Sequence, residues 1–257
     1  MQVLIDAGAI LLGYILGSIP FGLIWVKLIS GKDIRHVASG RTGGTNAARA
    51  AGAGAGILTA LMDGAKGVVS VWLALALSPG NHWVHVLAPV AAILGHNYSV
   101  FLLERHGEHR VRLRGGAGGA PTVGGAIGLW WPSGLIVLPL ALLVFFGIGY
   151  ASVTTISIAL IISAIFGVRY YLGLATVPDV LYGLIALWLL AWALRPNIRA
   201  LIEGRERFHG WRPWRKPTPL FPEHDEQPTR PRNSAMTRDG VKAKRKSRAV
   251  KPAAARR

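Results

Sequence analysis

The segment RLRGGAGGAPTVGG, residues 112–125, places two arginines directly before a run of glycines. Glycine lets a ligand approach the backbone closely, and free backbone N–H groups beside a cation bind anions. The run lacks the lysine and the hydroxyl residue of a nucleotide P-loop, so ATP binding is not expected. We therefore predict that Arg114, Gly115, Gly116 and Gly118 bind a phosphate group, although such glycines also permit close packing of membrane helices.

A second polar stretch, VASGRTGGTNAARAAGAGAG, begins at Val37 and leads into an apolar segment. Glycines leave backbone N–H groups free, and the positive end of a helix dipole favours bound anions. A solvated loop would explain the polarity but not the many small residues, so an anion site is predicted here. Its hydrogen-bonding side chains are Ser39, Thr42, Thr45, Asn46 and Arg49.

Three other groups of polar residues interrupt apolar sequence. In GSIPFG, Pro20 breaks a helix, and the break has either a packing or a functional explanation. In LMDGAKGV, Asp63 and Lys66 are three residues apart on one helix face, and we interpret them as a structural ion pair. In GHNYSVF, His96 is interpreted as a hydrogen-bonding residue, because no second histidine lies nearby at metal-ligand spacing.

The chain then needs elements that bring these residues together, and its composition indicates membrane helices. Hydrophobic residues make up 51% of the 257 residues, charged residues 16%, and the mean hydropathy is +0.38. A membrane helix needs ~20 mostly apolar residues to cross ~30 Å of hydrocarbon. We therefore predict an all-α, multi-pass membrane protein with seven spans. These are Val3–Ile29, Gly54–Leu77, Trp83–Leu103, Gly118–Trp131, Gly134–Gly149, Ser152–Tyr171 and Val177–Leu194.

The fourth and fifth segments are short, and the sequence WWPSG separates them. Two tilted short helices are favoured there over one re-entrant hairpin. Positive charges follow the first and third spans, whereas SPGNH and WWPSG contain no lysine or arginine. By the positive-inside rule, the N-terminus is outside and the C-terminus is cytoplasmic. Both glycine-rich stretches, Ser152 and the segment RPNIRALIEGRER with Asn197 and Glu206 then share the cytoplasmic side.

The net charge of +17 comes largely from the C-terminal segment, where residues 205–257 contain 16 basic and 5 acidic residues. We predict a membrane-embedded domain at 1–204 and a basic, disordered cytoplasmic tail at 205–257. A basic tail on an apolar body favours binding to anionic lipid, and no nucleic acid partner is expected. The chain has no cysteine, which excludes disulfides, thiolate metal sites and cysteine nucleophiles.

The polar segments, taken as a set, resemble those of the bacterial acyl-phosphate:glycerol-3-phosphate acyltransferases of the PlsY type. The matching segments are GSIPFG, SGRTGGTNAAR, MDGAKG, GHNYSVF, GGAG and NIRALIEGRE, spread over residues 17–206. The resemblance implies a seven-helix protein of the bacterial plasma membrane. It implies transfer of an acyl chain from acyl phosphate to the 1-hydroxyl of glycerol 3-phosphate, giving lysophosphatidic acid and phosphate without a metal, a cofactor or acyl-CoA.

The resemblance also implies roles for individual residues. Ser39, Arg49, His96 and Asn197 would be the catalytic residues that hold glycerol 3-phosphate. The run from Gly115 to Gly118 and Ser152 would hold acyl phosphate, and Glu206 would support the site from the closing segment.

Two positions depart from the family pattern. Family members generally have SGN.GATN where this chain has SGRTGGTN, so Arg41 replaces an asparagine and Gly44 an alanine. Ala117 stands where the family has a lysine that is expected to contact phosphate. The loss of one charge-assisted contact costs ~1.5 to 3 kcal/mol, and Arg114 or Arg41 are the candidates that would compensate. A non-catalytic relative that binds lipid or phosphate is the alternative function, and a transporter is a third.

The sequence contains no Ser-His-Asp set and no paired carboxylates that would indicate nucleophilic or acid–base catalysis. Phosphate is a good leaving group, so an enzyme acting on acyl phosphate mainly holds two anions and aligns a hydroxyl with a carbonyl. Our hypothesis is that substrate phosphate itself accepts the proton, with His96 as a binding residue.

Overall fold

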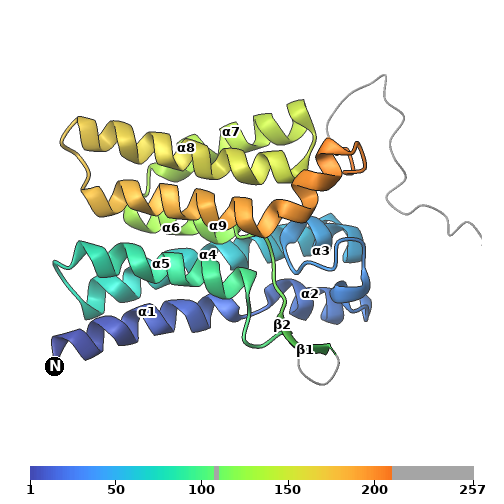
Figure 1. Cartoon of the computed structure of the whole chain (residues 1–257), viewed down its shortest axis with the longest axis horizontal. Helices are drawn as coiled ribbons and strands as arrows, with labels where there is room; N and C mark the ends of the chain where they lie inside the picture. The colour runs from blue at the N-terminus through green and yellow to red at the C-terminus, as the bar shows by residue number, and fades with distance from the viewer. Residues whose placement is uncertain (107–109, 210–257) are drawn as a thin grey trace, which may run out of the picture. The chain divides into compact units, whose positions relative to one another are not determined.

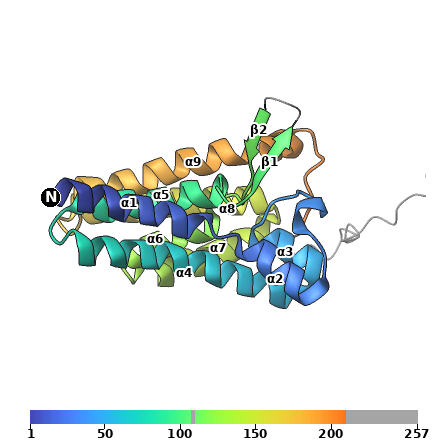
Figure 2. The ribbon, with the colours of Figure 1, turned by 90° about the horizontal axis from the view of Figure 1, so that it is seen from below.

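The computed structural model of the chain describes residues 1–106 and 110–209. These residues belong to one compact unit in which the long helices run side by side (Figure 1). The N-terminus lies at one end of the helices, and α2, α3 and a β-hairpin lie at the opposite end (Figures 1 and 2). The helices are α1 (Gln2–Ser18), α2 (Phe21–Ser30), η1 (Ile34–His36), α3 (Gly44–Ala51), α4 (Ala53–Leu77), α5 (His82–Asn97), α6 (Gly119–Leu129), α7 (Ser133–Ile148), α8 (Ala151–Tyr171) and α9 (Val177–Ile202).

Within the described residues, four helical segments are long and apolar enough to cross a membrane. Large apolar side chains such as Trp72, Leu143 and Trp188 are exposed on the outside of the unit, where lipid rather than water is the expected neighbour. The prediction of a helical, multi-pass membrane protein is confirmed at this level. The four segments are Gln2–Ser30, Ala53–Leu77, Ala151–Tyr171 and Val177–Ile202.

The first of these segments is broken where the sequence predicts it. Helix α1 ends at Ser18 and α2 begins at Phe21, because Pro20 has no N–H group to continue the helix. The break leaves carbonyl groups without helical partners. Nζ of Lys66 on α4 donates to the carbonyl oxygens of Gly17 and Ile19, at 2.8 and 2.9 Å. The ammonium group therefore satisfies backbone that lipid would leave unpaired.

The chain after α5 differs from the prediction, which continued that helix to Leu103. Helix α5 ends at Asn97, and two antiparallel strands follow, β1 (Leu103–His106) and β2 (Arg110–Leu113). The all-α prediction is therefore incomplete by one hairpin, which projects from the helices in Figure 2. Bonds to distant residues end the helix, since Ser99 donates its hydroxyl to the carbonyl of Ser18 (2.5 Å) and its N–H to that of Arg114 (3.0 Å).

The other predicted helices lie close to their expected positions. Helices α6 and α7 are separate, with 11 and 16 residues, and a turn at Trp130–Pro132 joins them. Helix α9 runs to Ile202, eight residues beyond the predicted Leu194, and passes through Pro196. This extension carries Asn197 on a helix instead of a loop.

Glycines let the helices pack with their backbones in contact. A Cβ atom at Gly17 of α1 would overlap the backbone of Ala92 on α5. In the same way, a Cβ atom at Gly124 of α6 would overlap the carbonyl of Gly64 on α4. Small residues at such crossings are typical of membrane helices, where van der Waals packing holds neighbouring helices together. The pairs α1–α5 and α4–α6 are accordingly among the most closely packed neighbours in the described part of the chain.

Helices α5, α6, α7, α8 and α9 contribute to the largest buried apolar cluster of the described residues, which includes Ile93, Phe166 and Leu190. Tyr182 of α9 is fully buried in it and donates its hydroxyl to the carbonyl of Thr122 on α6 (2.7 Å). This bond satisfies the one polar atom of the tyrosine side chain and joins α9 to the first turn of α6. The cluster thus fixes the helix that follows the glycine run.

We expect Gly124→Ala to destabilise the α4–α6 contact by about 1–3 kcal/mol, because the new methyl group overlaps a backbone carbonyl. The measurement is the thermal unfolding midpoint in detergent. Gly167→Ala on α8 is the matched control, since no atom lies within 4 Å of its Cβ position. Equal midpoints for both variants would show that the α4–α6 contact yields to accommodate the methyl group.

Candidate active site

The glycine run packs against the end of α5. The N–H group of Gly116 donates to the carbonyl of His96 (2.8 Å), and a Cβ atom at Gly116 would overlap Nε2 of the His96 ring. Gly118 has a φ of +84°, which favours glycine, and it caps the N-terminus of α6. The run therefore joins the hairpin to α6 and brings backbone directly against the imidazole.

Arg41 is the cation that the structure places at the glycine run. Its Nη1 atom donates to the carbonyl of Gly116 (3.0 Å), and its Nη2 atom donates to the carbonyl of Ala193 on α9. The N–H group of Thr42 also donates to the carbonyl of Gly115 (3.3 Å). The loop before α3, the glycine run and α9 thus meet around one guanidinium group.

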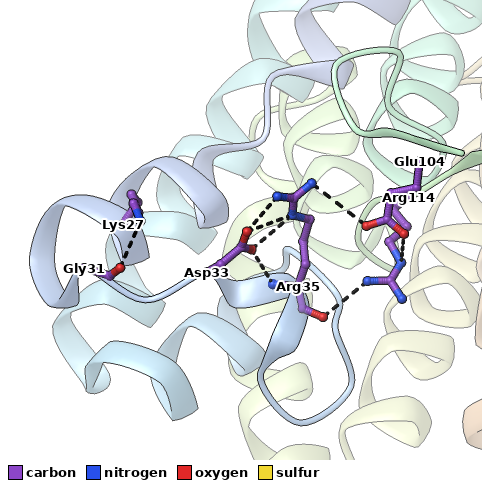
Figure 3. A network of polar contacts seen from close by, with 6 residues as sticks. All are labelled: Lys27, Gly31, Asp33, Arg35, Glu104 and Arg114. Carbon is purple, nitrogen blue, oxygen red and sulfur yellow. Dashed lines mark hydrogen bonds and ion pairs between the residues drawn. The ribbon is translucent and has the colours of Figure 1, made fainter.

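Arg114, which the sequence predicts as a phosphate ligand, is directed toward the hairpin (Figure 3). Its Nε atom lies 3.0 Å from Oε2 of Glu104, and its Nη1 atom donates to the carbonyl of Arg35 (3.2 Å). Arg35 in turn binds both carboxylate oxygens of Asp33. The role of Arg114 in this network is to tie the hairpin to the loop after α2.

The network changes the acidity of its aspartate. Hydrogen bonds from the Arg35 guanidinium lower the pKa of Asp33 to about 2 from its usual 3.8. Partial exposure of both side chains limits the strength of this pair. Its effect is therefore a modest, acid-sensitive stabilisation of the loop between α2 and α3.

A buried ionic cluster lies behind the glycine run and consists of Asp63, Lys66 and His96. Nζ of Lys66 lies 2.8 Å from Oδ1 of Asp63, and Nδ1 of His96 lies 3.5 Å from the same oxygen. All three side chains are at most 5% exposed. The spacing of Asp63 and Lys66 in the sequence predicted their ion pair. It did not predict the contact with His96, because residues on different helices show no common spacing.

Asn97 follows His96 at the end of α5 and is also buried. Neither polar atom of its amide has a hydrogen-bond partner among the described residues. A Cβ atom at Gly118 would lie 2.9 Å from the amide oxygen. An unpaired buried amide beside the glycine run is a group that a ligand could satisfy.

A second set of residues surrounds Arg49 on α3. Its Nη2 atom lies 2.5 Å from Nε2 of the His209 ring. The backbone N–H group of His209 donates to the carbonyl of Gly149 (2.6 Å). Burial lowers the pKa of the Arg49 guanidinium, and burial together with the Arg49 charge lowers the pKa of His209. Both shifts disfavour the charged form of a group that faces another cation. No pattern in the sequence singled out His209.

Ser152 lies in the first turn of α8, where Glu206 binds it. Oε2 of Glu206 accepts from the Ser152 hydroxyl (2.5 Å), and Oε1 accepts from its N–H group (3.2 Å). A carboxylate at this position stabilises the N-terminus of the helix. The described end of the chain, through residue 209, thus packs on α3 and α8, whereas residues 210–257 of the predicted tail lie outside the described residues.

The remaining predicted site residues differ in their exposure and in their hydrogen bonds. Ser39 and Thr45 are exposed, and the Ser39 hydroxyl accepts from the N–H group of Arg41 (3.4 Å). Asn46 is buried and donates its amide to the carbonyls of the loop that carries Arg41, so it shapes that loop. Asn197 is half-buried on α9, one turn after Ala193.

These contacts define an integral membrane protein with arginines, a buried histidine and glycine-rich backbone gathered at one end of its helices. Glycine-rich backbone beside guanidinium groups is suited to anions such as phosphate. The described residues include no group of three or more histidines and carboxylates that could hold a metal ion. The chain belongs to the glycerol-3-phosphate acyltransferase family, which matches residues 7–204.

Sequence similarity to individual glycerol-3-phosphate acyltransferases supports this assignment. The chain is 39% identical over 203 residues to a glycerol-3-phosphate acyltransferase of Rubrobacter xylanophilus, covering 79% of this chain and 94% of the relative. It is 34% identical to one of Gloeobacter violaceus, covering 75% of this chain and 89% of the relative.

Solved structures of an integral membrane glycerol 3-phosphate acyltransferase, PlsY, have the same fold. Its glycerol 3-phosphate form superposes with a TM-score of 0.68 at 29% identity, covering 80% of this chain and 96% of that one. Its lysophosphatidic acid form gives 0.65 at 27% identity, covering 79% and 94%.

The low pKa of Asp33 predicts how stability depends on pH. Because the folded-state pKa lies below the ordinary value, the Asp33–Arg35 pair stabilises the fold above about pH 4, and this contribution is lost as the pH falls toward 2. We expect Asp33→Asn to lower stability by about 1 kcal/mol at pH 6 and to have no effect near pH 2. Thermal unfolding from pH 2 to 7 measures the difference. Lys27→Gln, which removes an exposed bond to Gly31, is the control and should show no such pH dependence.

Proposed function

We propose that the protein transfers an acyl chain from acyl phosphate to the 1-hydroxyl of glycerol 3-phosphate, giving lysophosphatidic acid and phosphate for phospholipid biosynthesis. Membership of the glycerol-3-phosphate acyltransferase family supports this activity. The observation that carries it is the convergence of Arg41, His96 and the glycine run with Arg49 and Ser152 at one end of the helices.

The chemistry requires the protein to hold two phosphorylated molecules together. The hydroxyl oxygen attacks the carbonyl carbon, the bond from that carbon to the phosphate oxygen breaks, and the released phosphate carries the proton. Phosphate leaves readily, so most of the catalysis comes from positioning and from charge neutralisation. Guanidinium groups and backbone N–H groups supply both.

The two substrates are assigned to different parts of the site. Arg49 and His96, with Ser39 and Asn197, hold glycerol 3-phosphate. Gly115, Gly116 and Gly118 present backbone to the acyl phosphate, and Ser152 binds it from α8. Glu206 holds Ser152 in place, and Thr45 and Asn46 shape the wall formed by α3.

Arg41 supplies the cation that Ala117 lacks. It reaches the carbonyl beside Ala117, whereas Arg114 binds Glu104 and Arg35. This contact, together with membership of the acyltransferase family, favours a catalytic protein over a non-catalytic relative that binds lipid or phosphate.

The proposal includes a topology. Seven spans result if α1 and α2 form one span and α4, α5, α6, α7, α8 and α9 form the others. The N-terminus is then outside the bacterial plasma membrane, and the site and the C-terminus are cytoplasmic, as the positive-inside rule indicates. The basic segment after residue 209 would bind anionic lipid on that side.

The test of the activity is a purified assay with palmitoyl phosphate. We expect phosphate release and lysophosphatidic acid only when glycerol 3-phosphate is present. Arg41→Gln should lower kcat/KM by ten- to a hundredfold, the equivalent of ~1.5 to 3 kcal/mol for one charge-assisted contact. Arg195→Gln is the matched control, because Arg195 stacks on Trp192 and is exposed, so it should stay within about twofold.

Two outcomes would contradict the assignment. If the folded protein binds phosphate but forms no product, the non-catalytic alternative holds. In that case Ala117→Lys, which restores the lysine expected in the family, should create activity. If Arg41→Gln and Arg195→Gln behave alike, Arg41 does not supply the missing charge.

The topology is tested with single cysteines, because the chain has none of its own. His82→Cys is exposed at the start of α5, and Gly54→Cys lies in the first turn of α4 with no atom within 4 Å of its Cβ position. A membrane-impermeant maleimide should label His82→Cys in intact cells and Gly54→Cys only after permeabilisation. The reverse pattern would invert the proposed orientation.

A further inference from the structure

The ionic cluster of Asp63, Lys66 and His96 contains specific contacts in addition to the pairing of opposite charges. Lys66 directs its ammonium group at three oxygens, namely the carbonyls of Gly17 and Ile19 and the carboxylate of Asp63. The ammonium group thus donates to two carbonyl oxygens and forms an ion pair with the carboxylate. Lys66 is therefore held by the backbone of the α1–α2 break, and it holds Asp63 in turn.

Asp63 faces His96 from one side. Its Oδ1 atom lies 3.5 Å from Nδ1 of the ring, and its Oδ2 atom has no hydrogen-bond partner among the described residues. A carboxylate at this distance attracts an N–H group and repels a lone pair. In neutral His96 it therefore favours the tautomer with the proton on Nδ1 and the lone pair on Nε2.

The opposite edge of the ring faces the proposed substrate site. Nε2 lies against Gly116, where any side chain would overlap it. Arg41 binds the carbonyl of the same glycine. A lone pair at this position accepts a hydrogen bond from a hydroxyl group, whereas it repels the oxygens of an ionised phosphate.

We propose that Asp63 is a positioning residue that keeps the proton of His96 on Nδ1, so that Nε2 accepts a hydrogen bond from a hydroxyl of glycerol 3-phosphate. This assignment rests on the proposed function for the identity of the substrate. It makes the role of His96 more specific, from a residue that holds glycerol 3-phosphate to one that recognises the glycerol part of that molecule. It also gives the buried carboxylate a role beyond pairing with Lys66.

The competing explanation is that Asp63 only neutralises Lys66. The double variant Asp63→Asn with Lys66→Met separates the two, because it removes both charges and leaves no unpaired ion in the protein interior. If Asp63 positions His96, the folded double variant should lose at least about tenfold in kcat/KM for glycerol 3-phosphate, as expected when one hydrogen bond to substrate is lost. Activity within about threefold of wild type would overturn the proposal.

A control is needed for the loss of the Lys66 contacts with the α1–α2 break. The single variant Lys66→Met also loses the bonds to the α1–α2 break, but it keeps the Asp63 carboxylate beside His96. The proposal expects this variant to be less stable than the double variant, yet to retain more activity per folded molecule. Size exclusion and thermal unfolding in detergent measure the folded fraction for each variant.

The tautomer can be measured without any assay of activity. Nitrogen-15 labelling of histidine gives separate resonances for protonated and unprotonated ring nitrogens, and His96→Gln identifies those of His96. In the wild-type protein we expect Nδ1 to be protonated and Nε2 unprotonated, and in the double variant a mixture of both tautomers. A protonated Nε2 in the wild-type protein near pH 7.5 would overturn the proposal even if the enzyme is active. Absence of product with the expected resonances would instead contradict the proposed function alone.

Discussion

The arrangement of this protein depends on one buried charge, the ammonium group of Lys66. Pro20 breaks the first membrane helix, and the broken backbone needs a donor that lipid does not provide. Lys66 provides it, but an ammonium group inside the protein needs a counter-charge, and Asp63 is the carboxylate next to it. Because Asp63 also faces His96, the ionic cluster connects the helix break to the proposed substrate site. The break, α4 and the end of α5 are thus held by one ionic cluster.

Glycines allow two kinds of close contact in this structure. Between helices, glycines such as Gly17 and Gly124 let backbones touch, which holds α5 and α6 at fixed distances from α1 and α4. Between elements, Gly116 lets the loop before α6 lie directly on the His96 ring. A side chain at any of these positions would separate surfaces that must meet. Glycine therefore allows close packing both between the helices and between the glycine run and the His96 ring.

The arginines show that charge alone does not identify a binding residue. Arg114 adjoins the glycine run in sequence, yet its guanidinium binds Glu104 and the carbonyl of Arg35 and stabilises the hairpin (Figure 3). Arg41 is far from the run in sequence, yet it binds the carbonyl of Gly116. The hairpin explains this difference, because the contact with Glu104 of β1 holds the side chain of Arg114 away from the glycine run. The arginine that adjoins the run in sequence thus stabilises the hairpin, whereas an arginine from a distant segment contacts the run.

The sequence by itself determined the features that depend on local chemistry. Apolar length predicts the membrane helices, proline predicts the break before Phe21, and the glycines predict an irregular loop before α6. The tertiary structure alone decided the end of α5, the hairpin, the packing of His209 on Arg49 and the contact of Asp63 with His96. Each of these depends on groups from separate segments that the folded helices bring together. Residue spacing predicts contacts only within one helix or strand, so contacts between separate segments cannot be predicted from it.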